Sequence, residues 1–260
     1  MIYLNNKEKL DRIKLNKNNY YIISDFDQTI TSGLSIGTWG IDVTDKDEFN
    51  KKRQDLYNKY RPIEIDNTID IVEKYELMRI WYMESLKILV EYKIKEKDID
   101  EAIKKDEFKL RTGAKEFLQK MYNYNIPVLM LSAGIGNVIE KFLAYNNINF
   151  NNIYLDSNYL IFKDGDIQGI ADNIIHTMNK NYNSLIKKYG NLVKNKEYIL
   201  LFGDILSDIN MVSKDKLENT ITIGFLDINE KENLEIYNKT FDIVCTRNTS
   251  FNKIMEFLNI

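Results

Sequence analysis

The stretch YYIISDFDQT, residues 20–29, decides the fold and indicates where the chemistry lies. Its first half, Tyr20–Ser24, is an apolar run, and the carboxylates of Asp25 and Asp27 follow it directly. Near-continuous apolar strands are typical of a parallel sheet covered by helices on both faces. Two carboxylates at the mouth of a buried strand are costly unless something uses them. We therefore predict an α/β fold with a functional site at the carboxyl end of this strand.

The C-terminal half repeats this alternation of strands and helices. Further apolar runs predict strands at Pro127–Leu131, Tyr198–Phe202, Thr220–Phe225 and Asp242–Cys245. Amphipathic segments predict helices at Ala114–Tyr124, Asn137–Tyr145, Asn181–Tyr189 and Ser250–Leu258. Residues 158–170 read as a hairpin that turns at 163–166. The pattern predicts a Rossmann-like core built on a parallel sheet.

Residues 31–112 interrupt the alternation with a helical block. The predicted helices there are Asp45–Tyr60, Thr68–Tyr92 and Asp98–Lys105. A helical block inserted after the first strand is a candidate cap over that strand's carboxyl end, where open α/β sheets bind ligands. We expect a core domain of residues 1–30 and 113–260, and a cap domain of residues 31–112.

Composition excludes several classes of function. The 36 lysines and arginines nearly balance 39 aspartates and glutamates, so the net charge of −3 gives no sign of the excess positive charge that binding a nucleic acid polymer requires. No apolar run is long enough to cross a membrane, and the first residues lack the apolar centre of a secretion signal, so we expect a cytoplasmic protein. One Cys and one His exclude a disulfide and a zinc site built from these residues. The chemistry must rest on carboxylates, lysines, hydroxyls and backbone amides.

A second pair of carboxylates, Asp204 and Asp208, follows the apolar run Tyr198–Phe202. Together with Asp25 and Asp27, they would repel one another at one sheet edge by about 4 kcal/mol per close pair. A hard divalent cation relieves this repulsion, and an oxygen-only ligand set suits Mg²⁺. Taken alone, the second pair also fits helix capping by aspartate.

Two further signals point to phosphate. The turn Ser132–Gly136 follows a predicted strand and opens a helix, so its N–H groups and the Ser132 hydroxyl could bind a phosphate. Lys180 precedes the next helix and could balance the carboxylates. Each signal is weak by itself, because a Ser or Gly is a routine helix start and a lone lysine usually lies on the surface.

The order of these four signals resembles the four-motif signature of the haloacid dehalogenase-like phosphohydrolases. The resemblance implies that Asp25 is a nucleophile that forms an aspartyl-phosphate and that Asp27 is the general acid and base. It further implies a phosphate site of Ser132, Ala133, Gly134 and Lys180, and Mg²⁺ ligands Asp25, Asp27, Asp204 and Asp208. Ile205 departs from the signature, which usually has Ser there.

A narrower resemblance reaches into the predicted cap: residues there and in the core resemble the pyrimidine 5′-nucleotidase family of the cytosolic 5′-nucleotidase III type. The resemblance is carried by the segments 63–66, 73–75, 81–85, 132–136, 157–158, 175–176 and 179–180. It implies that Glu64 and Ser85 read a base and that Tyr82 stacks on it, with Trp39 as a hypothetical second aromatic. Without the family, Glu64 reads as a solvated charge and Tyr82 as cap core. For His176 we favour a structural role near Lys180.

The expected function is Mg²⁺-dependent hydrolysis of a nucleoside 5′-monophosphate, with a pyrimidine or 7-methylguanine base. One alternative is a small-molecule phosphatase of the phosphoserine phosphatase type, for which Glu64, Tyr82 and Ser85 offer no obvious partner for an amino acid's carboxylate. Others are a nucleoside phosphotransferase and an inactive phosphate-binding module; intact Asp25, Asp27 and Lys180 argue against the last.

Overall fold

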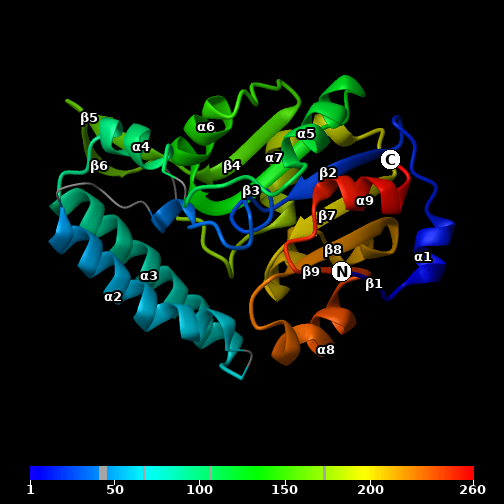
Figure 1. Cartoon of the computed structure of the whole chain (residues 1–260), viewed down its shortest axis with the longest axis horizontal. Coiled ribbons are helices and arrows are strands. Elements are labelled where there is room, and N and C mark those ends of the chain that lie inside the picture. Colours follow the sequence, from blue (N-terminus) through cyan, green and yellow to red (C-terminus); the bar gives the residue numbers. More distant parts are fainter. Residues whose placement is uncertain (41–45, 67, 106, 172–173) are drawn as a thin grey trace.

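The computed structural model describes residues 1–40, 46–66, 68–105, 107–171 and 174–260. Within these ranges a seven-stranded sheet has the order β1-β9-β8-β7-β2-β3-β4 (Figure 1). Its strands are β1 (Ile2–Leu4), β2 (Tyr20–Ser24), β3 (Val128–Ile135), β4 (Ile153–Asn158), β7 (Tyr198–Gly203), β8 (Thr220–Leu226) and β9 (Ile243–Thr246). Edge strand β1 runs antiparallel to β9, and the other neighbouring strands run parallel.

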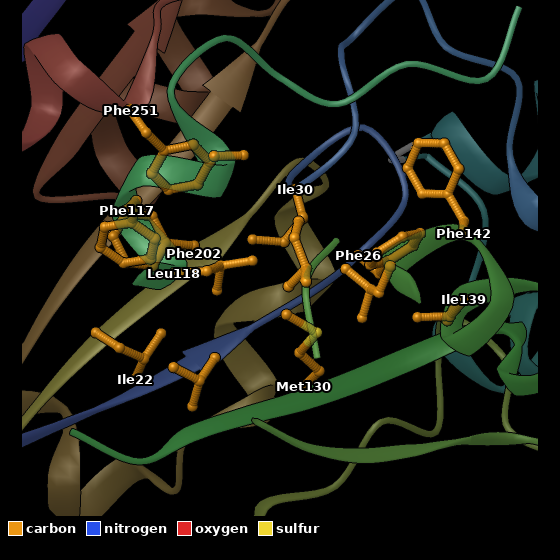
Figure 2. Packing of buried hydrophobic residues seen from close by; sticks show 14 of the residues in the cluster. Ile22, Phe26, Ile30, Phe117, Leu118, Met130, Ile139, Phe142, Phe202 and Phe251 are labelled. Atoms are coloured by element: carbon orange, nitrogen blue, oxygen red, sulfur yellow. The ribbon is translucent and has the colours of Figure 1, made fainter. Parts of the chain in front are cut away.

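Helices cover both faces of the sheet because successive strand residues point to opposite sides. Ile22 packs in the same cluster as Phe117 and Phe251, from the face covered by α5 (Ala114–Asn123), α6 (Gly136–Tyr145) and α9 (Phe251–Leu258). Figure 2 shows this cluster, in which Phe26 meets Phe142. Ile23 points the other way, toward Leu185 of α7 (Tyr182–Val193). The predicted α/β fold is confirmed.

The structure adds elements that the sequence pattern did not predict. They are β1, β4 and the polar helices α1 (Lys7–Arg12) and α8 (Glu230–Thr240). Strand β4 was missed because half of its residues, Asp156–Asn158, are polar. The turn predicted at residues 132–136 is also different, since Ser132–Ile135 continue β3 and α6 begins only at Gly136.

The segment between β2 and α5 leaves the sheet, and its two ends are joined where Thr31 pairs with Leu110 in an isolated antiparallel bridge. It contains the short 3₁₀-helix η1 (Thr38–Gly40) and the α-helices α2 (Asp47–Ile65), α3 (Ile71–Glu91) and α4 (Glu96–Ala102). Helices α2 and α3 lie side by side, apart from the sheet (Figure 1). The predicted hairpin is present as β5 (Leu160–Lys163) and β6 (Asp166–Ile170), and β6 packs against α3.

Helix α2 is longer than predicted and contains Pro62. Proline usually ends a helix, and the pattern therefore placed the end at Tyr60. The last turn persists because its carbonyls have partners: the Asp66 N–H donates to Pro62, and the Lys74 ammonium donates to the Glu64 carbonyl at 3.0 Å. The predicted start at Asp45 lies outside the described residues.

Two short 3₁₀-helices, η2 (Leu206–Met211) and η3 (Lys214–Asn219), connect β7 to β8. None of the helices in the described part of the chain is both long enough and apolar enough to span a bilayer.

Candidate active site

Three carboxylates meet at the carboxyl ends of the adjacent strands β2 and β7. Asp25 follows β2, whereas Asp204 and Asp208 follow β7. One oxygen of each carboxylate lies within 4.8 Å of the others, in the only such group of acidic, His or Cys side chains found among the described residues. Burial and mutual repulsion raise the pKa of Asp204 well above its ordinary value. A cation at this place would relieve that repulsion.

Lys180 supplies one positive charge to the group. Its ammonium donates to Asp25 at 2.5 Å and to Asp208 at 2.9 Å. The Lys180 side chain is 2% exposed, and the two carboxylates are 6% and 0% exposed. Burial alone would lower the pKa of Lys180, but the two carboxylates raise it, so the ammonium keeps its charge. The predicted lysine is a buried member of the cluster.

Asp27, two residues beyond Asp25, points to a different partner. Its carboxylate accepts from the Thr38 N–H at 3.1 Å and from the Thr38 hydroxyl at 2.8 Å. Burial raises the pKa of Asp27 to about 6, although the Thr38 hydrogen bonds lower it in part. The Asp27 carboxylate is not in the three-carboxylate group. Burial thus favours a protonated Asp27, whereas its contacts with Thr38 favour the ionised form.

Thr38 was missed by sequence reasoning, because no motif marks it. Its hydroxyl also accepts from the Ile135 N–H at 3.0 Å, which joins the Asp27 loop to the end of β3. Gly134 makes this contact possible, since a Cβ there would lie 2.2 Å from the Thr38 hydroxyl oxygen. Thr38 therefore fixes both Asp27 and the predicted phosphate turn.

The predicted phosphate residues Ser132, Ala133 and Gly134 line the same cavity as Asp25 and Lys180. The turn is held within the fold, because the Gly134 N–H donates to the Ser132 hydroxyl at 3.0 Å. The Ala133 carbonyl accepts from the Asn158 amide and from the indole N–H of Trp39. The expectation of free N–H groups at a helix start is therefore wrong for Gly134, while the Ser132 hydroxyl can still donate.

The far wall of this cavity, which has a volume of about 520 Å³, is built by the inserted helices. Helix α2 contributes Glu64, and α3 contributes Tyr82 and Ser85. The Tyr82 ring meets that of Trp39 edge-on at 5.4 Å. The structure thus brings the predicted base-reading residues into one cavity with Asp25 and Asp204 of the carboxylate cluster.

Arg61 was not predicted, and it changes the surroundings of Glu64. The two residues are three apart on α2, and the Arg61 guanidinium donates to the Glu64 carboxylate. Their side chains are 22% and 4% exposed. Because the predicted helix ended at Tyr60, the sequence pattern did not place the two on one helix face; extending that helix by one turn would have done so.

His176 lies beside the loop that carries Lys180. Its ring is fully buried and meets the Tyr75 ring edge-on at 4.5 Å, and its Nδ1 accepts from the Met178 N–H. Burial lowers the pKa of His176 to about 4, so the ring is neutral near pH 7. The residue does not line the cavity described above.

Comparisons with known proteins agree with this geometry. The profile of the family described as pyrimidine 5′-nucleotidase (UMPH-1) matches residues 34–260. The 7-methylguanosine phosphate-specific 5′-nucleotidase A of Xenopus laevis is 33% identical over 269 residues, which are 97% of this chain and 92% of the relative. A crystal structure of cytosolic 5′-nucleotidase IIIB bound to cytidine superposes with a TM-score of 0.83 at 28% identity, covering 99% of this chain and 92% of that one.

More distant structures share the fold alone. A substrate-bound phosphoserine phosphatase superposes with a TM-score of 0.63 at 18% identity over 94% of this chain and 99% of its own. Together with the profile match, these likenesses confirm the resemblance that the motifs indicated. The chain belongs to the pyrimidine 5′-nucleotidase (UMPH-1) family.

Proposed function

We propose that this protein is an Mg²⁺-dependent 5′-nucleotidase of the cytoplasm that hydrolyses pyrimidine or 7-methylguanosine 5′-monophosphates through an aspartyl-phosphate. One observation carries the proposal. Asp25, Lys180 and Asp204, three members of a cluster completed by the buried Asp208, line a single cavity with the aromatic and polar wall formed by α2 and α3. The names of the relatives support a nucleotide as substrate.

Asp25 is the proposed nucleophile. One of its oxygens attacks the phosphorus, and the bond from phosphorus to the ester oxygen breaks. Asp27 gives its proton to the leaving oxygen, a role that suits a carboxyl whose pKa is raised to about 6. In the second half of the reaction Asp27 takes a proton from water as that water attacks the phosphorus. The bond to Asp25 then breaks and inorganic phosphate leaves.

The remaining core residues bind the phosphoryl group. Lys180 neutralises part of its charge, and the Ser132 hydroxyl donates to one of its oxygens. The oxygen donors of Asp25, Asp204 and Asp208 fit Mg²⁺, which prefers carboxylate and carbonyl ligands. When bound, Mg²⁺ supplies positive charge that stabilises the transferring phosphoryl group.

Residues 31–112 are the proposed specificity cap, and residues 1–30 and 113–260 the catalytic core. In the cap, Glu64 and Ser85 accept or donate hydrogen bonds at the edge of the base, and Tyr82 and Trp39 pack on its ring. Base–aromatic stacking contributes about 1–3 kcal/mol. The cavity lining that joins these four residues to the core cluster supports this division.

One observation favours a second candidate substrate. Arg61 and Glu64 form a cation–anion pair in the cavity, and such a pair could hold the carboxylate and the ammonium of phosphoserine. Glu64, Tyr82 and Ser85 offer no obvious partner for a carboxylate, but Arg61 beside Glu64 could be one. The aromatic wall of Tyr82 and Trp39 has no role with phosphoserine, and for this reason we prefer the nucleotide.

The test is a substrate panel with purified protein and Mg²⁺. It contains CMP, UMP, GMP, 7-methyl-GMP, O-phosphoserine and p-nitrophenyl phosphate, and phosphate release gives kcat/KM for each. The proposal predicts that a pyrimidine or 7-methylguanosine monophosphate exceeds p-nitrophenyl phosphate by at least tenfold. A preference for phosphoserine would replace the nucleotidase assignment. Adding a nucleoside acceptor and measuring the new monophosphate tests for phosphotransfer.

A further inference from the structure

The wall that α2 contributes to the cavity is not simply acidic. Arg53, Tyr57, Arg61 and Glu64 recur every three or four residues on α2, so they share one face, and all four line the cavity. This face therefore carries two guanidinium groups and one carboxylate. From the core, the cavity receives three carboxylates and the Lys180 ammonium. Glu64, which the motif marks as a base reader, thus shares its helix face with two guanidinium groups.

The charge of Glu64 is already engaged by Arg61. The Arg61 guanidinium hydrogen-bonds to the Glu64 carboxylate, whose side chain is 4% exposed. Burial alone would lower the pKa of Arg61, but the carboxylates of Glu64 and Asp204 raise it above its ordinary value. The guanidinium is therefore permanently charged and faces both the cap and the core.

This pairing matters because the two candidate bases differ in charge. A 7-methylguanine ring carries a positive charge, and cytosine and uracil rings are neutral. A lone Glu64 would attract a cationic ring, whereas a Glu64 already paired with Arg61 offers little net negative charge, and the guanidinium repels the ring. A neutral ring has no such penalty, since Arg61 can donate to a ring acceptor while Glu64 accepts from a neighbouring N–H.

We propose that Arg61 is a specificity-determining residue that makes the cap favour nucleotides with a neutral base over nucleotides with a cationic base. The inference rests on the proposed nucleotidase function and deepens it. The preference expected for this chain therefore differs from the specificity for 7-methylguanosine phosphate that the names of its relatives state.

The test compares kcat/KM for 7-methyl-GMP with kcat/KM for CMP in mildly acidic buffer, where the methylated ring is cationic. Arg61→Gln removes the charge and keeps hydrogen-bond donors, and we expect it to raise the ratio of 7-methyl-GMP to CMP about tenfold. Arg61→Lys keeps the charge and should leave the ratio within about twofold of the wild type. Because both substrates are measured on the same sample, a fraction of misfolded protein cancels from the ratio.

Arg79 provides a matched control. It forms the same kind of pair, three residues from Glu76 on α3, but its side chain is 49% exposed and it does not line the cavity. Arg79→Gln should therefore leave the ratio unchanged. Should Arg61→Gln fail to fold, Arg61→Met, which keeps the packing of the alkyl stem, gives the same measurement.

The outcomes separate this inference from the function on which it rests. A wild type that hydrolyses both nucleotides, with a ratio that Arg61→Gln does not raise, overturns the role of Arg61 and leaves the nucleotidase intact. An equal rise in Arg61→Lys or Arg79→Gln also overturns it, because the effect would then not follow the charge in the cavity. A wild type that hydrolyses p-nitrophenyl phosphate but neither nucleotide overturns both.

Discussion

The two ends of the cavity are constructed differently. At the core end, Asp25, Asp208 and Lys180 are at most 6% exposed, and the Lys180 ammonium donates to both carboxylates beside the ends of parallel strands. At the cap end, Arg61 and Glu64 lie on a helix that stands apart from the sheet, and the Arg61 side chain is 22% exposed (Figure 1). Strand ends are fixed by the ladder of the sheet, whereas a helix face can change residues without disturbing it. The core end therefore suits a reaction common to all phosphomonoesters, and the cap end suits a choice among them.

The largest effect should come from the core. Asp25→Asn keeps the shape of the side chain but removes the proposed nucleophile, so kcat should fall by about 10⁴-fold for every substrate. Steady-state kinetics with a nucleotide and with p-nitrophenyl phosphate check this, with circular dichroism as the control for folding. A variant that keeps more than about a hundredth of the wild-type kcat would refute the aspartyl-phosphate.

Removal of the proposed metal should also affect the core end of the cavity, and therefore the turnover of every substrate. EDTA is expected to abolish turnover of all substrates, and added Mg²⁺ to restore it. Asp204→Ala should raise the Mg²⁺ concentration needed for half-maximal activity by at least about tenfold, because one ligand of three is lost. Titration of activity against Mg²⁺ measures this. Full activity in EDTA would contradict the reading of the carboxylate cluster as a metal site.

Thr38 offers a test with an intermediate expected effect, because it joins Asp27 to the end of β3. Thr38→Val removes the hydroxyl that donates to Asp27 and accepts from the Ile135 N–H. Loss of bonds to a charged group costs about 1.5–3 kcal/mol, so kcat should fall at least tenfold. The fall should be equal for a nucleotide and for p-nitrophenyl phosphate. A fall in kcat for nucleotides alone would instead indicate that Thr38 acts in base recognition at the cap end of the cavity.

The smallest effect concerns stability where core and cap meet. Burial lowers the pKa of His176 to about 4 from an ordinary 6.5, so the unfolded chain binds a proton first as the pH falls. The stability that this group contributes is complete above pH 6.5 and is lost toward pH 4. Between pH 7 and pH 5 the wild type should lose about 1–2 kcal/mol more than His176→Gln. Urea unfolding at the two pH values measures this, and equal losses would show that His176 does not titrate as a buried group.

Much of the fold could be predicted because its central strands are almost continuously apolar. β2, β7, β8 and β9 were each recognised to within one or two residues at either end. β1 and α8 escaped because short or largely polar segments at an edge or surface carry little periodicity. Pro62 misled the prediction for α2, because the contacts that stabilise its last turn come from residues outside it.

The residues of the site also divide into those that the sequence pattern reveals and those that it does not. Asp25, Lys180, Asp204 and Asp208 could be found because each follows a strand or precedes a helix in a recognisable order. Thr38 and Arg61 carry no such signal. Their importance arises from contacts with Asp27 and Glu64 that only the folded chain provides.

The central claim is that the core carries out the reaction and the cap selects the base. It is tested most directly by the ratio of kcat/KM for the best nucleotide to kcat/KM for p-nitrophenyl phosphate, compared between wild type and Glu64→Ala. One charge-assisted hydrogen bond contributes about 1.5–3 kcal/mol, so the ratio should fall roughly 10- to 150-fold, with most of the loss in KM for the nucleotide. A ratio that Glu64→Ala leaves unchanged would contradict the claim.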